Sequence, residues 1–143
     1  MFVRHIDAPP LNIVVVKPSA GLDTASAYAA YDRARIPPAS PDELIAACQS
    51  GNVERIVAAM SNNMERAAIS LVPEVADTLA WVRGAHGVLG GSVAGSGSAV
   101  FGICIDRSAA QVVARDARLR GWWAAAAPSR GEGVRVQPLR EAL

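Results

Sequence analysis

A glycine turn lies between two apolar runs in the second half of the sequence, where residues 90–103 read GGSVAGSGSAVFGI. Gly95, Ser96 and Gly97 supply bare backbone amides and a hydroxyl, which are groups that can hold an anion in a concave nest. The same glycines can instead serve a β-hairpin, because glycine adopts the positive φ angles that tight turns require. Taken locally, the residues favour the hairpin and leave the anion site open.

The glycine turn lacks the patterns of the known nucleotide loops. A P-loop requires GxxxxGK[ST], which is absent, and a dinucleotide fingerprint requires GxGxxG at the start of a helix. Gly95 and Gly97 are instead followed by Ser98-Ala99-Val100 and a strand-like run. The two nucleotide-binding patterns are therefore excluded.

A second candidate for binding chemistry is the stretch PSAGLDTASAY, residues 18–28, which enters an alanine-rich segment. Thr24 lies near the expected helix N-terminus, and Tyr28 follows it by one turn. Residues at this spacing share a helix face, so the hydroxyl and the ring would point in one direction beside a partly positive helix end. Together they could present a stacking surface for a base. The simpler interpretation is a capping threonine and a tyrosine in or near the core.

The remaining polar residues show no catalytic or metal-binding pattern. His5 and His86 have no carboxylate or cysteine at ligand spacing, so we expect surface or loop positions. Cys48 and Cys104 are far apart and belong to no CxxC pair, which indicates neither a disulfide framework nor a zinc site. The pair Asn62-Asn63 is expected on a helix surface or in a turn, where its amides could brace a neighbouring loop.

The composition excludes several functional classes. The chain has 143 residues, enough for one domain with its own core. Its 14 Lys and Arg and 13 Asp and Glu nearly cancel, so we expect neither a nucleic-acid partner nor membrane-surface binding. No apolar stretch approaches the roughly 20 residues of a membrane span, and the N-terminus lacks the apolar segment of a signal peptide. These features predict a soluble, cytoplasmic protein.

Hydrophobic periodicity predicts the elements that position the candidate residues. The β-branched run LNIVVV, residues 11–16, is bounded by prolines and predicts a buried strand. Helices are predicted from Asp23 or Thr24 to before Pro37, from Ser40 to before Gly51, over residues 53–60, from Pro73 to Gly84, and from a Ser108 cap to Gly121. Further strands are predicted over residues 87–93, 99–105 and 134–136. The core is expected to include Leu44, Ile56, Val100 and Val112. This order favours an α+β sandwich with a mainly antiparallel sheet and helices on one face.

Four segments in this order resemble one family: KPSAGLDTASAY, NNMERAAISLVPEVADTL, GVLGGSVAGSGSAVFGI and VRVQPLREAL. They are similar to the C-terminal half of GHMP-type small-molecule kinases, in particular the 4-diphosphocytidyl-2-C-methyl-D-erythritol kinases of non-mevalonate isoprenoid biosynthesis. The resemblance covers nearly the whole chain from about Leu11 onward. It implies a ferredoxin-like fold and a single substrate-side domain over residues 1–143.

The resemblance also implies roles for the candidate residues. Gly95, Ser96 and Gly97 match the family's third motif, close to the phosphate groups where two domains meet. Thr24 and Tyr28 match positions on the substrate side, where an aromatic ring stacks against cytosine. The residue before Gly95 is usually serine or threonine in this family and is alanine here, so one hydroxyl is missing.

The family's ATP loop and catalytic lysine and aspartate belong to an N-terminal half for which this chain has no counterpart. We therefore expect the complete enzyme to use ATP and Mg to phosphorylate the 2-hydroxyl of its cytidine-containing substrate, with an N-terminal kinase domain as partner. For this chain alone we expect neither a cofactor nor activity, because phosphoryl transfer needs metal-bridged phosphates and an oriented nucleophile. Two alternatives stay open: a stand-alone binding or regulatory module of the same fold, and the half-domain of another GHMP kinase.

Overall fold

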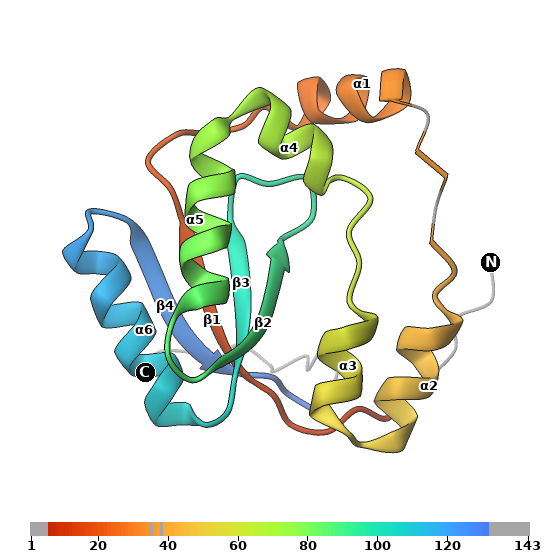
Figure 1. The fold of residues 1–143 in the computed structure, drawn as a ribbon, viewed down its shortest axis with the longest axis vertical. Helices are drawn as coiled ribbons and strands as arrows, with labels where there is room; N and C mark the ends of the chain where they lie inside the picture. The colour runs from red at the N-terminus through yellow and green to blue at the C-terminus, as the bar shows by residue number, and fades with distance from the viewer. Residues whose placement is uncertain (1–5, 35, 38, 132–143) are drawn as a thin grey trace, which may run out of the picture.

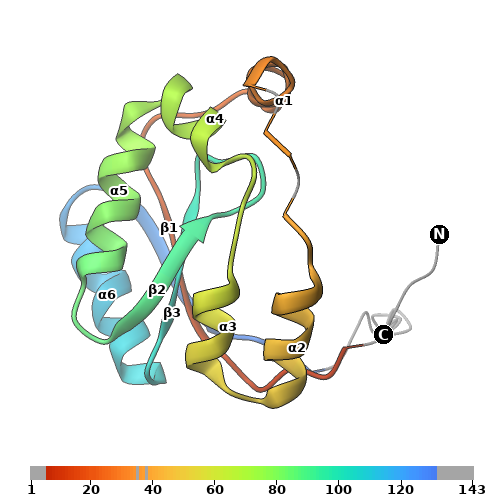
Figure 2. The ribbon, with the colours of Figure 1, turned by 45° about the vertical axis from the view of Figure 1, so that its right-hand side comes forward.

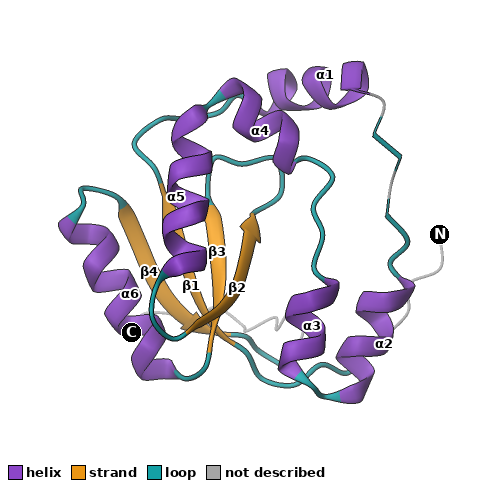
Figure 3. Cartoon of the chain, in the orientation of Figure 1, coloured by secondary structure: helices purple, strands orange, loops and turns teal. Residues whose placement is uncertain are grey.

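The computed structural model describes residues 6–34, 36–37 and 39–131. Within these residues, one four-stranded sheet is surrounded by helices α1 to α6 (Figures 1 and 3). His5 and the strand predicted at residues 134–136 lie outside the described residues.

The strands are β1 (Asn12–Lys17), β2 (Val88–Val93), β3 (Val100–Cys104) and β4 (Trp123–Pro128). The helices are α1 (Thr24–Ala34), α2 (Asp42–Ser50), α3 (Val53–Ala59), α4 (Glu65–Leu71), α5 (Pro73–Gly84) and α6 (Arg107–Leu119). The strand order is β2-β3-β1-β4, and each neighbouring pair is antiparallel. With helices between β1 and β2 and again between β3 and β4, this is the βαββαβ arrangement of a ferredoxin-like sandwich. The predicted α+β class is confirmed.

The main core lies between the sheet and the helices α5 and α6. Val14 and Val16 alternate with less buried neighbours along β1. Both are fully buried on the face that α5 and α6 cover. Leu79 and Val82 reach them from α5, and Val113 reaches them from α6. These long apolar contacts remove most of the β1 surface from water, which is the main stabilising term in a domain of this size.

A second, smaller cluster lies on the opposite face of the sheet. There α2 and α3 pack Ala47 and Ile56 against Ile103 of β3, with Phe101 beside them. Figure 2 shows α5 and α6 on one side of the sheet and the α2–α3 pair on the other. Helices therefore cover both faces of the sheet, whereas the sequence predicted them on one face.

Two details of the prediction for α6 were wrong. The N-cap is Asp106, whose carboxylate accepts a hydrogen bond from the N–H of Ala109 at 2.7 Å, whereas Ser108 lies inside the first turn. Val112 is 42% exposed, because it lies one residue, about 100°, away from the buried Val113 around the helix. Of the other expected core residues, Ile56 and Val100 are buried and Leu44 is half-buried.

Helix α4 and strand β4 were not predicted as separate elements. Across the described residues, no helix combines the length and the apolar character needed to cross a membrane.

Candidate functional site

The glycine turn joins β2 to β3 as a tight hairpin connection. The N–H of Ala94 donates to the carbonyl of Ala99 at 2.8 Å, and the N–H of Gly97 donates to the carbonyl of Ala94 at 3.0 Å. Gly95 and Gly97 have φ angles of 59° and 91°, which are in the region that favours glycine. The predicted turn between adjacent strands with positive φ is confirmed.

The first residue of α1 reaches this turn from a distant part of the sequence. The hydroxyls of Thr24 and Ser96 lie 3.4 Å apart, so either can donate to the other. Figure 1 shows α1 and the β2–β3 turn at the same end of the molecule. Tyr28 lies one helical turn further along α1 and is 55% exposed, so its ring is not part of the core. The structure thus brings together the residues that the sequence singled out.

Asp23 fixes the start of α1. Its carboxylate accepts hydrogen bonds from the hydroxyl of Ser26 at 2.7 Å and from the N–H of Ser26 at 2.8 Å. The hydroxyl bond is the main cause that lowers the pKa of Asp23 below its ordinary value, with the N–H bond adding to it. Of the two caps that the sequence allowed, the structure has Asp23, which leaves the Thr24 hydroxyl available to Ser96.

Glu74, in the first turn of α5, holds the loop that leads into α1. Its carboxylate accepts from the N–H of Ala20 at 3.0 Å, from the hydroxyl of Ser19 at 2.9 Å and from the indole N–H of Trp122 at 3.3 Å. The bond from Ala20 is the largest cause that lowers the pKa of the Glu74 carboxyl, and the bonds from Ser19 and Trp122 act in the same direction. The sequence analysis missed this residue. Its only local mark is an acidic side chain directly after Pro73 at a helix start.

Two further side chains complete the surroundings of the turn. Asn62, in the connection between α3 and α4, donates from its amide to the carbonyls of Val93 and Gly95. Asn62 therefore braces a neighbouring loop, as the sequence allowed for the pair, whereas Asn63 makes no such contact within the described residues. Ser98 is 4% exposed, and its buried hydroxyl has no hydrogen-bond partner among the described residues. The Ser98 hydroxyl therefore has unused hydrogen-bonding capacity.

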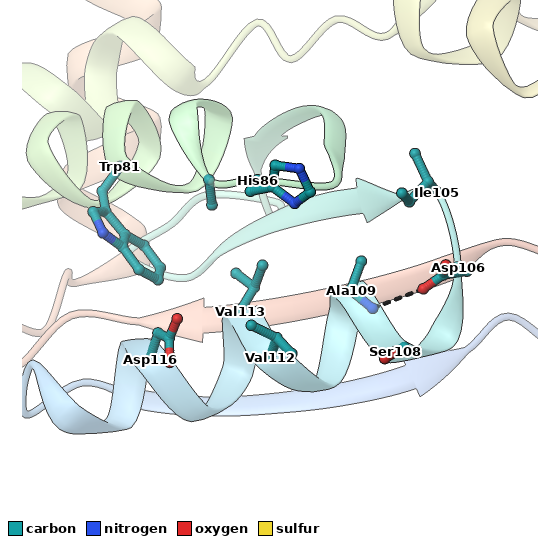
Figure 4. A pocket seen from close by; sticks show the side chains of 10 residues that line it. Trp81, His86, Ile105, Asp106, Ser108, Ala109, Val112, Val113 and Asp116 are labelled. Carbon is teal, nitrogen blue, oxygen red and sulfur yellow. Dashed lines mark hydrogen bonds between the residues drawn. The ribbon is translucent and has the colours of Figure 1, made fainter.

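A groove of about 410 Å³ lies elsewhere, between α5 and α6 (Figure 4). Trp81, His86, Ile105 and Asp116 contribute to its lining. The Asp106 carboxylate at its edge is already engaged as the cap of α6, shown by the dashed line in Figure 4. His86 is an exposed loop residue, as predicted. The groove lies where β3 ends, and the glycine turn lies where β3 begins, so the groove and the predicted site are separate.

The described residues contain no group of three or more His, Cys, Asp or Glu side chains placed to hold a metal ion. The chemistry around the glycine turn is that of neutral hydroxyls, backbone amides and an aromatic ring. Such groups bind and orient polar ligands by hydrogen bonding and stacking.

Residues 44–121 match the protein family described as GHMP kinases C terminal. The chain belongs to this family. It is 35% identical over 119 residues to the 4-diphosphocytidyl-2-C-methyl-D-erythritol kinase of Desulfitobacterium hafniense (strain Y51), a match that covers 80% of this chain and 40% of the relative. A kinase of the same description from Pelotomaculum thermopropionicum is 38% identical over 114 residues, which cover 78% of this chain and 39% of the relative.

The fold is also shared with a solved structure of this description. A crystal structure of 4-(cytidine 5'-diphospho)-2C-methyl-D-erythritol kinase superposes with a TM-score of 0.71 at 26% identity, over 87% of this chain and 45% of that chain. The chain spans about two fifths of the length of the curated relatives it matches. The family match includes the glycine turn and begins after α1, so Thr24 and Tyr28 lie outside it.

Proposed function

We propose that this chain is the substrate-side half of an ATP-dependent kinase that phosphorylates the 2-hydroxyl of 4-diphosphocytidyl-2-C-methyl-D-erythritol. The observation that carries the proposal is the contact between the hydroxyls of Thr24 and Ser96, 3.4 Å apart. This contact joins the start of α1 to the glycine turn and, with the exposure of Tyr28 on α1, supports a ligand site at this edge. The names of the curated relatives support this substrate over others.

In this proposal each part of the edge has a separate role. Tyr28 stacks on the cytosine ring, since an aromatic side chain supplies a π-face to a base. The backbone amides of Gly95 and Ser96 and the hydroxyls of Thr24 and Ser96 hydrogen-bond to phosphate oxygens and orient the diphosphate. Because phosphoryl transfer depends mainly on positioning and electrostatics, orientation of the substrate is a direct contribution to the rate.

The remaining chemistry belongs to the N-terminal half of the complete enzyme. That half supplies the sites for ATP and Mg²⁺ and the base that accepts the proton of the 2-hydroxyl. The oxygen of this hydroxyl then forms a bond to the γ-phosphorus, and the bond from that phosphorus to the β–γ bridging oxygen breaks. We expect the isolated chain to fold and to show no kinase turnover.

The test is a hybrid enzyme. Residues 1–143 are joined behind the N-terminal portion of the Desulfitobacterium hafniense relative, and ADP formation is followed with ATP and the diphosphocytidyl substrate. We expect turnover by the hybrid and none by the isolated chain or by the hybrid without substrate. Turnover by the hybrid with mevalonate in place of the diphosphocytidyl substrate would contradict the proposed specificity.

If the hybrid is inactive, a second measurement decides whether the chain binds a cytidine nucleotide. The isolated chain is titrated with cytidine diphosphate, and with inorganic pyrophosphate as the control ligand that lacks a base. Binding of the cytidine nucleotide at the Tyr28 edge without turnover in the hybrid would indicate a binding module in place of a kinase half. Equal affinities for the two ligands would remove the support that Tyr28 gives to the proposal, because stacking requires the base.

A further inference from the structure

Asn62 connects the start of α4 to the glycine turn through a single side chain. Its Nδ2 atom donates to the carbonyl of Val93 at 2.7 Å and to the carbonyl of Gly95 at 2.9 Å. Its Oδ1 atom accepts from the N–H of Met64 at 2.8 Å. A side-chain amide has two donor hydrogens, and here both point to the turn while the oxygen holds the amide in place.

Asn62 adds a restraint at Gly95, whereas the other end of the glycine turn is restrained by the backbone hydrogen bond from Gly97 and by packing around Gly97. Glycine at positive φ has access to many other backbone conformations, so Gly95 and Gly97 do not by themselves select one. An added Cβ at Gly95 would meet no atom within 4 Å, so packing does not restrict this residue. Asn62 also lines a pocket of about 430 Å³, together with residues that include Tyr31 and Leu44. At Gly95, the hydrogen bond from Asn62 therefore supplies the restraint that packing supplies at Gly97.

The neighbouring amide provides a natural contrast. Within the described part of the chain, the side chain of Asn63 makes no hydrogen bond to the turn or to any other group, and it is half-buried like that of Asn62. The two residues are therefore neighbours in the sequence with the same side chain, and they differ in their contact with the turn.

We propose that Asn62 is a positioning residue that sets the conformation of the glycine turn and thereby the geometry with which Ser96 and the turn amides meet a phosphate group. The inference deepens the proposed function and rests on it. Asn62 touches neither substrate nor cofactor in this account. It acts through the carbonyls of Val93 and Gly95, which it holds in one arrangement before the ligand arrives.

The test compares Asn62→Asp with Asn63→Asp. Aspartate at position 62 keeps the acceptor for Met64 but loses both donors, and its carboxylate then faces two carbonyl oxygens. We expect the ligand-free amide resonances of Gly95, Ser96 and Gly97 to shift or broaden in Asn62→Asp. We expect its affinity for cytidine diphosphate to fall roughly tenfold, the factor that corresponds to about 1.4 kcal/mol of lost preorganisation. Asn63→Asp adds the same charge and should leave both measurements as in the original chain. Unchanged turn resonances in Asn62→Asp would overturn the inference.

A measurement on the unsubstituted chain covers the case in which Asn62→Asp does not fold. The side-chain NH₂ protons of Asn62 should exchange with water more slowly than those of Asn63, because they are hydrogen-bonded. Equal exchange rates at the two positions would overturn the inference without any variant. If no form of the chain binds cytidine diphosphate, the proposed function fails, while the ligand-free resonances still decide the role of Asn62.

Discussion

The packed layer between the sheet and the helices α5 and α6 differs from the edge formed by α1 and the glycine turn in the kind of contact that maintains it. The layer encloses large apolar side chains such as Leu79, Val14 and Val82. The edge relies on polar contacts made by single residues, and α1 buries only Ala27. Substitutions in the layer should therefore change folding, whereas substitutions at the edge should change binding with little effect on stability.

The largest expected effect comes from the packed layer. Leu79 is 2% exposed, so Leu79→Ala leaves a cavity and should lower the free energy of unfolding by about 2 to 5 kcal/mol. Leu119→Ala is the matched control, since Leu119 is 81% exposed on α6 and its truncation should change stability by less than about 0.5 kcal/mol. Urea denaturation of both variants measures the difference. Equal losses in the two variants would show that burial in the layer is not what stabilises it.

The next effect arises where the edge meets the layer, at Gly97. Its φ angle is 91°, and a side chain there would approach Ala68 and Leu22, since an added Cβ lies 3.1 Å from an atom of each. Gly97→Val should cost about 1 to 3 kcal/mol of unfolding free energy through backbone strain. Gly95→Asn is the control, because asparagine tolerates the left-handed region and no atom lies within 4 Å of the added Cβ. A valine variant as stable as the asparagine variant would show that the turn rearranges freely.

Glu74 gives a smaller effect that depends on pH. The pKa of its carboxyl is lowered in the folded chain, so the folded state favours the ionised form, and the resulting stability is full above the ordinary value of 4.5. As pH falls through the folded pKa, this contribution is lost. Glu74→Gln should therefore be less stable than the original chain near neutral pH, and the difference should shrink in acid. Melting temperatures between neutral pH and pH 3 provide the measurement, with Glu54→Gln on α3 as the control for charge removal. A difference that grows in acid would contradict this account.

Tyr28 should show the smallest effect on folding. With its side chain 55% exposed, Tyr28→Ala should change the free energy of unfolding by less than about 0.5 kcal/mol. The same variant should bind cytidine diphosphate about 5- to 150-fold more weakly, since a stacked base contributes about 1 to 3 kcal/mol. Tyr28→Phe keeps the ring and should bind as the original chain does. Unfolding of the alanine variant would place Tyr28 in the core after all.

The sequence predicted the fold wherever apolar periodicity was clear, as in β1 and α5. It did not predict β4, whose residues WAAAAP lack β-branched side chains and have no local preference for a strand. This strand forms because its backbone pairs with β1 from Asn12 to Lys17. The pairing is a tertiary effect that no local pattern contains.

The candidate site was predicted in part. The glycine turn and the Thr24 region were each visible as local patterns, but only the fold brings Thr24 within 3.4 Å of Ser96, 72 residues away in the sequence. Glu74 was missed for the same reason, because its partners Ser19 and Trp122 are 55 and 48 residues away. Residues that act through distant partners carry no local mark beyond their own chemistry.

The most direct test of the central claim is a titration of the isolated chain with cytidine diphosphate, followed through the backbone amide resonances. The account predicts that the largest shifts occur at Thr24, Tyr28 and Gly95 to Gly97, while the resonance of Leu79 in the packed layer stays in place. Largest shifts at His86 and Asp116, which line the α5–α6 groove, would contradict the account, as would a titration in which Thr24 and Tyr28 do not respond.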